Sequence, residues 1–107
     1  MLSIDEFRRL DLRVATIVGA EAHPNADRLL VLKIDLGTEQ RQLVAGIRAH
    51  YAPETLVGKQ IVVVANLEPA TLRGVESQGM LLAATDAEGR LAFVTPEKPV
   101  GNGATVK

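Results

Sequence analysis

Cysteine is absent from this chain of 107 residues, and both aromatic side chains and excess charge of one sign are scarce. Without cysteine the chain has no disulfide framework, no cysteine metal site and no thiol catalysis. The aromatic residues are Phe7, Tyr51 and Phe93, too few for a binding mode that stacks successive bases on rings. The 12 cations and 13 carboxylates nearly cancel, so the bulk charge does not identify a nucleic-acid binder.

Long apolar runs and targeting segments are also missing. No run approaches the ~20 residues of a membrane helix, and the N-terminus lacks the apolar core of a signal peptide. We therefore expect a cytoplasmic protein without a membrane partner. The length predicts a single domain, residues 1–107, that is large enough to form a core without staples.

The most distinctive feature that is present is the polar segment 66–80, which lies between two strongly apolar stretches. It carries Asn, Arg, Ser and Gln side chains, more than a simple chain reversal requires. Loops on a rigid scaffold are where binding residues concentrate. Arginine supplies 8 of the 12 cations, and its forked guanidinium suits contacts with phosphate.

The N-terminal residues predict a short amphipathic helix. Ser3 and Glu6 form a capping box, and Ile4, Phe7 and Leu10 share one helical face. About two turns are well below the ~12–15 residues that are stable alone in water. The helix must therefore pack on its own barrel or on a partner.

Two-residue periodicity then predicts strands at about 12–20, 28–36 and 41–45, and apolar runs predict strands at 61–65, 80–84 and 91–94. The connector 46–59 contains one helical turn, opened by Pro53, and residues 96–107 should be irregular. This order indicates an all-β OB-fold. We expect a five-stranded Greek-key barrel with a short N-terminal helix, a helical turn between strands three and four, and C-terminal extension strands.

The strands at 61–65 and 80–84 are apolar on both faces, whereas a small barrel buries one face of each strand. The excess apolar surface predicts a covering partner, most simply a second copy of the chain.

A family likeness is carried by a set of motifs in a fixed order: Asp11–Val14, His23–Leu29, Val64–Pro69 and Arg73–Met80. Together they resemble the tRNA-binding domain at the C-terminus of many methionyl-tRNA synthetases, and the free-standing dimeric and CsaA-type relatives of that domain. The segments Tyr51–Glu54 and Leu56–Lys59 also match, and they favour the synthetase-associated branch. The likeness covers nearly the whole chain.

The resemblance implies an OB-fold, a homodimer, and recognition of tRNA by shape rather than by sequence. It implies a non-catalytic module that assists methionyl-tRNA synthetase or acts as a free-standing tRNA-binding protein. Because the chain starts directly before the helix of the family, we expect a separate polypeptide or an excised domain without the aminoacylation core. The alternative is a CsaA-type chaperone-like or dimerisation module that binds polypeptide.

The predicted RNA-binding residues are Asn25, Arg28, Lys33, Arg41, Asn66, Arg73, Ser77, Gln78 and Met80. Each has a structural alternative. Arg28 could pair with Asp27, and Lys33 and Arg41 could pair with Asp35 or Glu39. Asn25 could serve the conformation of its turn, and Asn66 could cap the backbone. The segment Arg73–Met80 could be a turn that meets backbone requirements, with Met80 in the core.

No catalytic, metal or cofactor site is predicted. His23 and His50 are far apart in the sequence, so we interpret them as free surface histidines rather than as metal ligands. Ser77 lacks the strand–turn–helix elbow of a nucleophilic serine. Arg13 is interpreted as part of an ion pair with Asp11 or Glu68.

Overall fold

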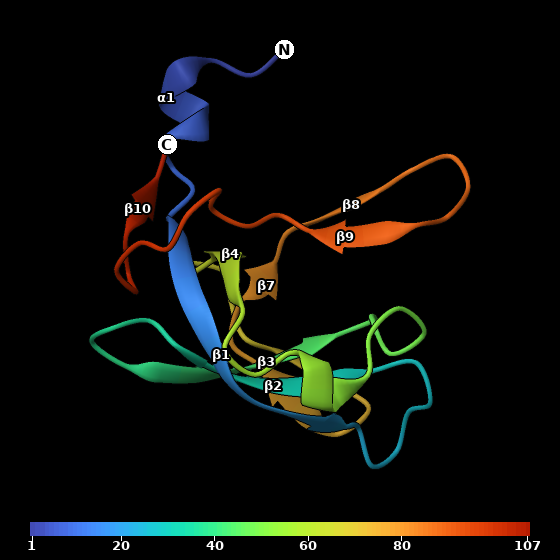
Figure 1. Cartoon of the computed structure of the whole chain (residues 1–107). Coiled ribbons are helices and arrows are strands. Elements are labelled where there is room, and N and C mark those ends of the chain that lie inside the picture. Colours follow the sequence, from blue (N-terminus) through green and yellow to red (C-terminus); the bar gives the residue numbers. More distant parts are fainter.

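The computed structural model describes residues 1–107 and shows a nearly closed β-barrel with a short helix at one end (Figure 1). The elements are α1 (Ile4–Phe7), β1 (Leu12–Ala22), β2 (Leu30–Asp35), β3 (Gln40–Ala45), the 3-10 helix η1 (Pro53–Thr55), β4 (Gln60–Val64), β5 (Ala70–Leu72), β6 (Val75–Ser77), β7 (Met80–Leu81), β8 (Ala83–Thr85), β9 (Leu91–Phe93) and β10 (Thr105–Val106). The predicted OB-like barrel, with its helical turn between β3 and β4, is confirmed.

The long strand β1 organises the barrel. The main sheet has the order β3-β2-β1-β4-β7, and β10 also pairs with β1. The first half of β1 pairs with β4, and the second half pairs with β2. The register shifts between Ile17 and Gly19, which is where a β-bulge bends the strand and lets it serve both neighbours.

The core lies inside the barrel and follows the alternation of the sequence. Leu30, Leu32, Ile34 and Leu36 from β2 and its end pack with inner residues of β1, β3 and β4. On β4, Ile61 and Val63 point inward, whereas Val62 and Val64 join a small outer cluster with Leu12.

The outer face of β4 was expected to be covered by a partner, and this expectation is corrected in part. Val62 and Val64 are buried within the chain itself, under a cluster that includes Leu82 and Val106 of the C-terminal half. The predicted strand 80–84 is split into β7 and β8, and Ala83 is exposed. The chain therefore covers part of the apolar surface that the sequence assigned to a partner.

The C-terminal segment is more ordered than predicted. Residues 105–106 form β10 against β1, and Gly103 donates to the carbonyl of Val14. Asn102 accepts a 2.6 Å bond from Thr16, and Gln60 binds the backbone of Val100 in both directions. These side-chain bonds span long sequence separations, so local periodicity could not indicate them.

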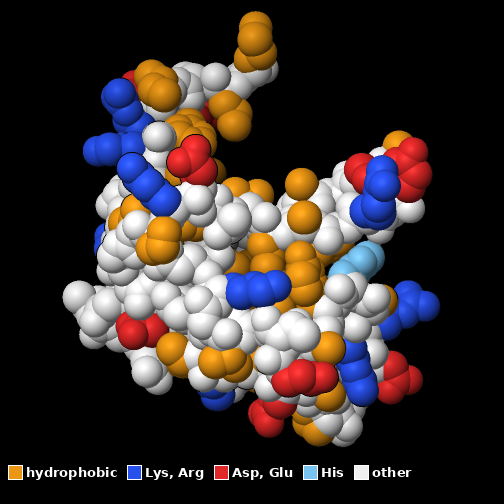
Figure 2. Space-filling model, in the orientation of Figure 1, with side chains coloured by type: hydrophobic (Ala, Val, Ile, Leu, Met, Phe, Trp, Pro, Cys, Tyr) orange, Lys and Arg blue, Asp and Glu red, His pale blue; other side chains and the backbone are white.

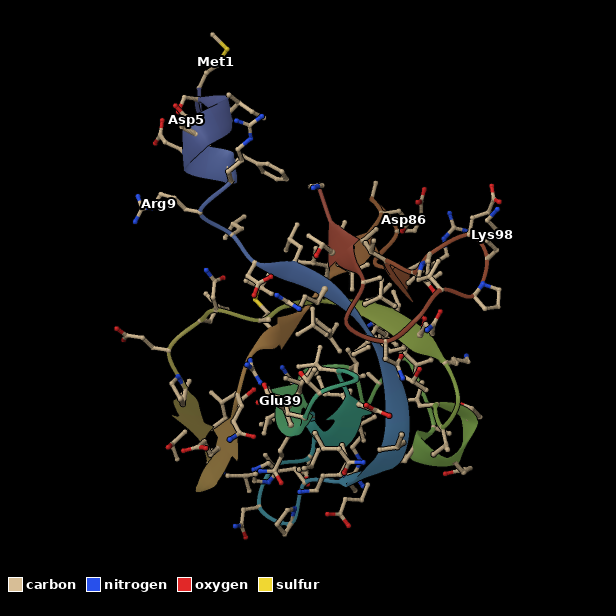
Figure 3. All side chains as sticks on the ribbon, turned by 90° about the vertical axis from the view of Figure 1, so that its left-hand side faces the viewer. Met1, Asp5, Arg9, Glu39, Asp86 and Lys98 are labelled. Carbon is tan, nitrogen blue, oxygen red and sulfur yellow. The ribbon has the colours of Figure 1, made fainter.

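Strands β8 and β9 form a hairpin that projects from the barrel, here called the arm (Figure 1). Its base is held by Phe93, which stacks on Tyr51 with ring centroids 4.4 Å apart. At its tip, one carboxylate oxygen of Asp86 accepts from the amides of Glu88 and Arg90. Figure 3 shows Asp86 at the end of the barrel nearer to α1.

Helix α1 has the predicted capping box, in which Ser3 and Glu6 bond reciprocally at 3.1 Å. It is four residues long rather than two turns, and it contains no buried residue. Figures 1 and 3 show it standing clear of the barrel. The sequence predicted that this helix packs either on its own barrel or on a partner, and the structure does not show it packed on the barrel. Neither helix is long and apolar enough to span a membrane.

Candidate nucleic-acid interface

The segment predicted as a polar loop contains a β-hairpin, formed by β5 and β6. Its two-residue turn is Arg73-Gly74, with φ angles of 53° and 89°. Positive φ at both positions is the requirement of a type I′ turn, which normally favours Asn-Gly. Arg73 is the only non-glycine residue of the chain with positive φ. An arginine held in this costly conformation at an exposed tip suggests selection for its guanidinium rather than for stability.

The hairpin is joined to β3 by the side chains of Ser77 and Gln78, which accept hydrogen bonds from backbone amides of β3 in place of carbonyl groups. The hydroxyl of Ser77 accepts a 2.9 Å bond from the amide of Val44 and donates to the carbonyl of Gly79. The side chain of Gln78 accepts from the amide of Gln42, and its backbone amide donates to the carbonyl of Gln42. Since Ser77 is buried and both functions of its hydroxyl are used, it holds the hairpin in place.

Gly79, which follows the hairpin, occupies a position where a side chain would be strained and crowded. It has a φ of 135°, and a Cβ atom there would lie 3.0 Å from the carbonyl oxygen of Val64. The close approach that this glycine permits is therefore to β4.

The turn between β1 and β2 lies beside the tip of the hairpin. A guanidinium nitrogen of Arg73 donates to the carbonyl of Asn25 at 3.3 Å. His23 is only 3% exposed and contacts the carbonyl of Leu72, so the interpretation of His23 as a free surface histidine is wrong. The error arose because this burial depends on a hairpin 49 residues away. The side-chain amide of Asn25 is exposed and has no hydrogen-bond partner within the chain.

Two predicted cations are exposed and free of carboxylates. Arg28 forms no ion pair, so the alternative pairing with Asp27 does not occur. Lys33 donates to the side-chain oxygen of Gln42 and pairs with neither of the carboxylates considered from the sequence. Both cations remain available to a ligand.

Arg48 is a candidate that the sequence reasoning missed. Its amide donates to the carbonyl of Arg28, and its side chain is exposed without an ion pair. The antiparallel register of β2 and β3, which pairs Leu30 with Ala45, brings the two arginines together just beyond the strand ends. A register assigned to the predicted strands 28–36 and 41–45 could have placed Arg28 beside Arg48 from the sequence alone.

Two other predicted residues are engaged within the protein. Arg41 pairs with Glu39, and the same side chain donates to the carbonyls of Ala65 and Gln78. The side chain of Asn66 accepts from the amide of Asp11 and donates to the carbonyl of Arg9 at 2.7 Å. The structure thus matches the capping alternative for Asn66. The side chain of Asn66 joins the linker between α1 and β1 to the end of β4. For both residues, RNA contact remains only a prediction.

Met80 and Arg13 are also away from the cations. Met80 is half-exposed on β7, opposite Val64, and so lies on the face of the outer apolar cluster rather than in the core. Arg13 pairs with Asp11 at 2.9 Å, which confirms one of its two proposed partners.

We define the candidate interface as five exposed side chains that the β1–β2 turn, strand β2, the segment after β3 and the β5–β6 hairpin bring to one region: Asn25, Arg28, Lys33, Arg48 and Arg73. No aromatic residue belongs to it. Near Lys33, an open recess of polar residues is lined by Gln40, Arg41, Gln42 and Gln78. No group of three or more His, Asp or Glu side chains is placed to hold a metal ion.

The family comparison identifies the domain. Residues 12–105 match the family model described as a putative tRNA binding domain. The chain belongs to this family. The matched family is a non-catalytic tRNA-binding module, and this domain carries its pattern from β1 to β10.

Curated relatives of this tRNA-binding domain are methionine–tRNA ligases. The ligase of Thermococcus kodakarensis is 58% identical over 106 residues, and that of Deinococcus radiodurans is 51% identical over 107 residues. The matches cover 99% and 100% of this chain but only 14% and 16% of the two ligases. The chain thus spans a small part of the length of these enzymes.

Two solved structures share the fold over their whole length. A MetRS-related protein from Pyrococcus horikoshii superimposes with a TM-score of 0.94 at 36% identity, covering 100% of this chain and 98% of its own. The chaperone CsaA from Bacillus anthracis superimposes with a TM-score of 0.90 at 32% identity, covering 100% and 99%.

Proposed function

We propose that this domain binds tRNA as a homodimer in the cytoplasm, where it either assists methionyl-tRNA synthetase or acts as a free-standing tRNA-binding protein. The observation that carries the proposal is the placement of Arg73. Its backbone is held in a costly conformation at the hairpin tip, and its guanidinium lies against the turn that carries Asn25 and Arg28.

The mode of binding follows from the composition of the interface. Arg28, Lys33 and Arg73 are exposed cations that can contact phosphate oxygens, and Arg48 adds a fourth. The side chain of Asn25 supplies a polar group. The side chain of Gln78, which lines the recess near Lys33, adds another that is partly occupied by its bond from β3. Phosphate contacts position a protein on RNA without reading its sequence.

Aromatic stacking has no place in this mode. Tyr51 and Phe93 stack on each other at the base of the arm, and Phe7 belongs to α1. RNA helices are recognised mostly through shape, phosphates and 2′-hydroxyl groups, which does not require aromatic side chains. The interface therefore suits the folded, double-helical part of a tRNA.

The proposed dimer rests on apolar surface at the helical end of the molecule. We call the exposed side chains Leu2, Ile4, Phe7, Leu10 and Leu67 the helix patch. Leu2 and Ile4 are 74% and 61% exposed, and α1 has no barrel surface over it. Figure 2 shows further apolar side chains on the floor of the hollow between α1 and the arm. A second copy would cover both.

A titration of folded tRNA tests the proposal. Fluorescently labelled tRNA is titrated with the protein at several salt concentrations, with an unfolded polypeptide as competitor. If each protomer contacts about three phosphates, the log–log salt slope should be roughly two to three. Replacing Lys33 by Ala should reduce that slope by about one. Lys98→Ala, in the C-terminal segment beside Pro99, is the matched control and should leave the slope unchanged.

The second candidate function is polypeptide binding. It is favoured by the helix patch and by the similarity to the CsaA chaperone. Binding of the unfolded polypeptide without binding of tRNA at low salt would overturn the tRNA proposal in favour of this alternative.

A further inference from the structure

His23 lies directly after β1 and is almost fully buried, although the turn that follows it is mostly exposed. Both nitrogens of its ring have a partner. Nε2 lies 2.9 Å from the carbonyl oxygen of Leu72, and Nδ1 accepts a 2.9 Å bond from the amide of Asn25. A backbone amide can only donate and a carbonyl can only accept. The ring proton therefore sits on Nε2, and the ring is neutral.

Of these two bonds, the one to Leu72 connects the two loops of the candidate interface, and the one from Asn25 lies within the turn itself. Leu72 ends β5 and directly precedes Arg73, whereas Asn25 stands in the turn between β1 and β2. The guanidinium of Arg73 then returns to the carbonyl of Asn25. His23, Leu72, Arg73 and Asn25 thus form a closed circuit of hydrogen bonds and peptide bonds.

The hairpin needs such an anchor. It is an isolated two-stranded sheet, a structure that is marginally stable by itself. Strand β6 and the residue after it are joined to β3 through Ser77 and Gln78. On the β5 side, the only hydrogen bonds from the tip to the rest of the protein are those of Leu72 with His23 and of Arg73 with Asn25.

We propose that His23 is a positioning residue that fixes the Arg73 guanidinium relative to the Asn25–Arg28 turn, so that both loops contact the same stretch of RNA. The proposal deepens the function proposed above and rests on it. Two loops fixed at one spacing bind without the entropic cost of ordering them separately. Loss of one hydrogen bond of this kind should weaken tRNA binding by a factor of about 3–10.

Two conservative variants separate the bonds of His23. In His23→Gln, the side-chain amide nitrogen reaches the place of Nε2 and can still donate to Leu72, while the bond from Asn25 is lost. In His23→Asn, the side-chain oxygen reaches the place of Nδ1 and can still accept from Asn25, while the bond to Leu72 is lost. Each variant loses one bond, so urea denaturation should show similar stabilities.

The tRNA affinities should differ between the variants. We expect His23→Gln to bind labelled tRNA within about twofold of the unsubstituted chain, and His23→Asn to bind about 3–10 times more weakly. In an Arg73→Ala background, His23→Asn should cause no further loss, because the group that it positions is absent. A role in folding alone would not produce this coupling.

Three results would overturn the inference. These are equal affinities of the two histidine variants, an undiminished effect of His23→Asn in the Arg73→Ala background, and a ring protonated on Nδ1 in the ¹⁵N spectrum of the unsubstituted protein. If the unsubstituted chain itself fails to bind tRNA, the proposed function is wrong, and the role of His23 in it is wrong as well.

Discussion

The hydroxyl of Ser77 accepts a 2.9 Å hydrogen bond from the backbone amide of Val44, so a side chain takes the place of a neighbouring strand. Val44 belongs to β3, and Ser77 ends β6. Together with the bonds between Gln42 and Gln78, this contact joins the hairpin to the barrel.

The role of Ser77 predicts a stability effect. Ser77→Ala leaves the buried amide of Val44 without a partner, which should lower the free energy of unfolding by about 1–3 kcal/mol. Urea denaturation measures this change. The control is Glu76→Ala on the exposed face of the same strand, which should change stability by less than about 0.5 kcal/mol. Equal stability of Ser77→Ala and the unsubstituted protein would contradict the role.

The strained turn predicts that stability and binding change in opposite directions. Asparagine tolerates positive φ and relieves about 1 kcal/mol of backbone strain, which exceeds the small contribution of the exposed 3.3 Å bond from Arg73 to Asn25. Arg73→Asn should therefore raise the free energy of unfolding. The same change removes a phosphate contact and should lower the salt slope of tRNA binding by about one. Lys98→Asn, outside the interface, should leave tRNA binding unchanged. If Arg73→Asn is more stable and binds tRNA with an unchanged affinity and salt slope, the guanidinium does not contact RNA.

The helix patch predicts that dimerisation can be removed without unfolding. Ile4→Asp places a carboxylate in the first turn of α1, where an acidic residue is favourable for the helix but not for an apolar interface. Light scattering should give twice the mass of the chain for the unsubstituted protein and the mass of one chain for the variant. Val57→Asp, an exposed site beside η1, is the control and should remain dimeric. A monomeric unsubstituted protein would contradict the dimer.

The tip of the arm predicts a local transition in acid. The amide of Arg90, its guanidinium and the amide of Glu88 hold the pKa of Asp86 below its ordinary value of 3.8. Because the pKa is depressed, the ionised carboxylate of Asp86 stabilises the folded arm at pH values above 3.8. This stabilisation is lost as the pH falls through the lower pKa of the folded state. Amide signals of residues 86–90 should therefore shift with a midpoint below 3.8. This transition should be absent in Asp86→Asn, and a midpoint at or above 3.8 in the unsubstituted protein would contradict it.

Much of the barrel could be predicted because its signals are local. The alternation of Leu30, Leu32 and Ile34, the capping box at Ser3 and the turn at Pro53 each act over a few residues. The hairpin at 70–77 was missed because its turn is Arg-Gly rather than the usual Asn-Gly. Strand β10 was missed because it is two residues long and is defined by its pairing with β1.

The sequence by itself determined the barrel class, the short helix, the absence of thiol chemistry and the motifs of the tRNA-binding family. Only the tertiary structure decided which polar residues remain free for a ligand. It showed Arg41, Asn66 and Ser77 to be engaged within the protein, and it brought Arg48 beside Arg28. It also buried His23 beneath the hairpin. Most of these outcomes depend on hydrogen-bond partners that are distant in the sequence, which local patterns do not indicate.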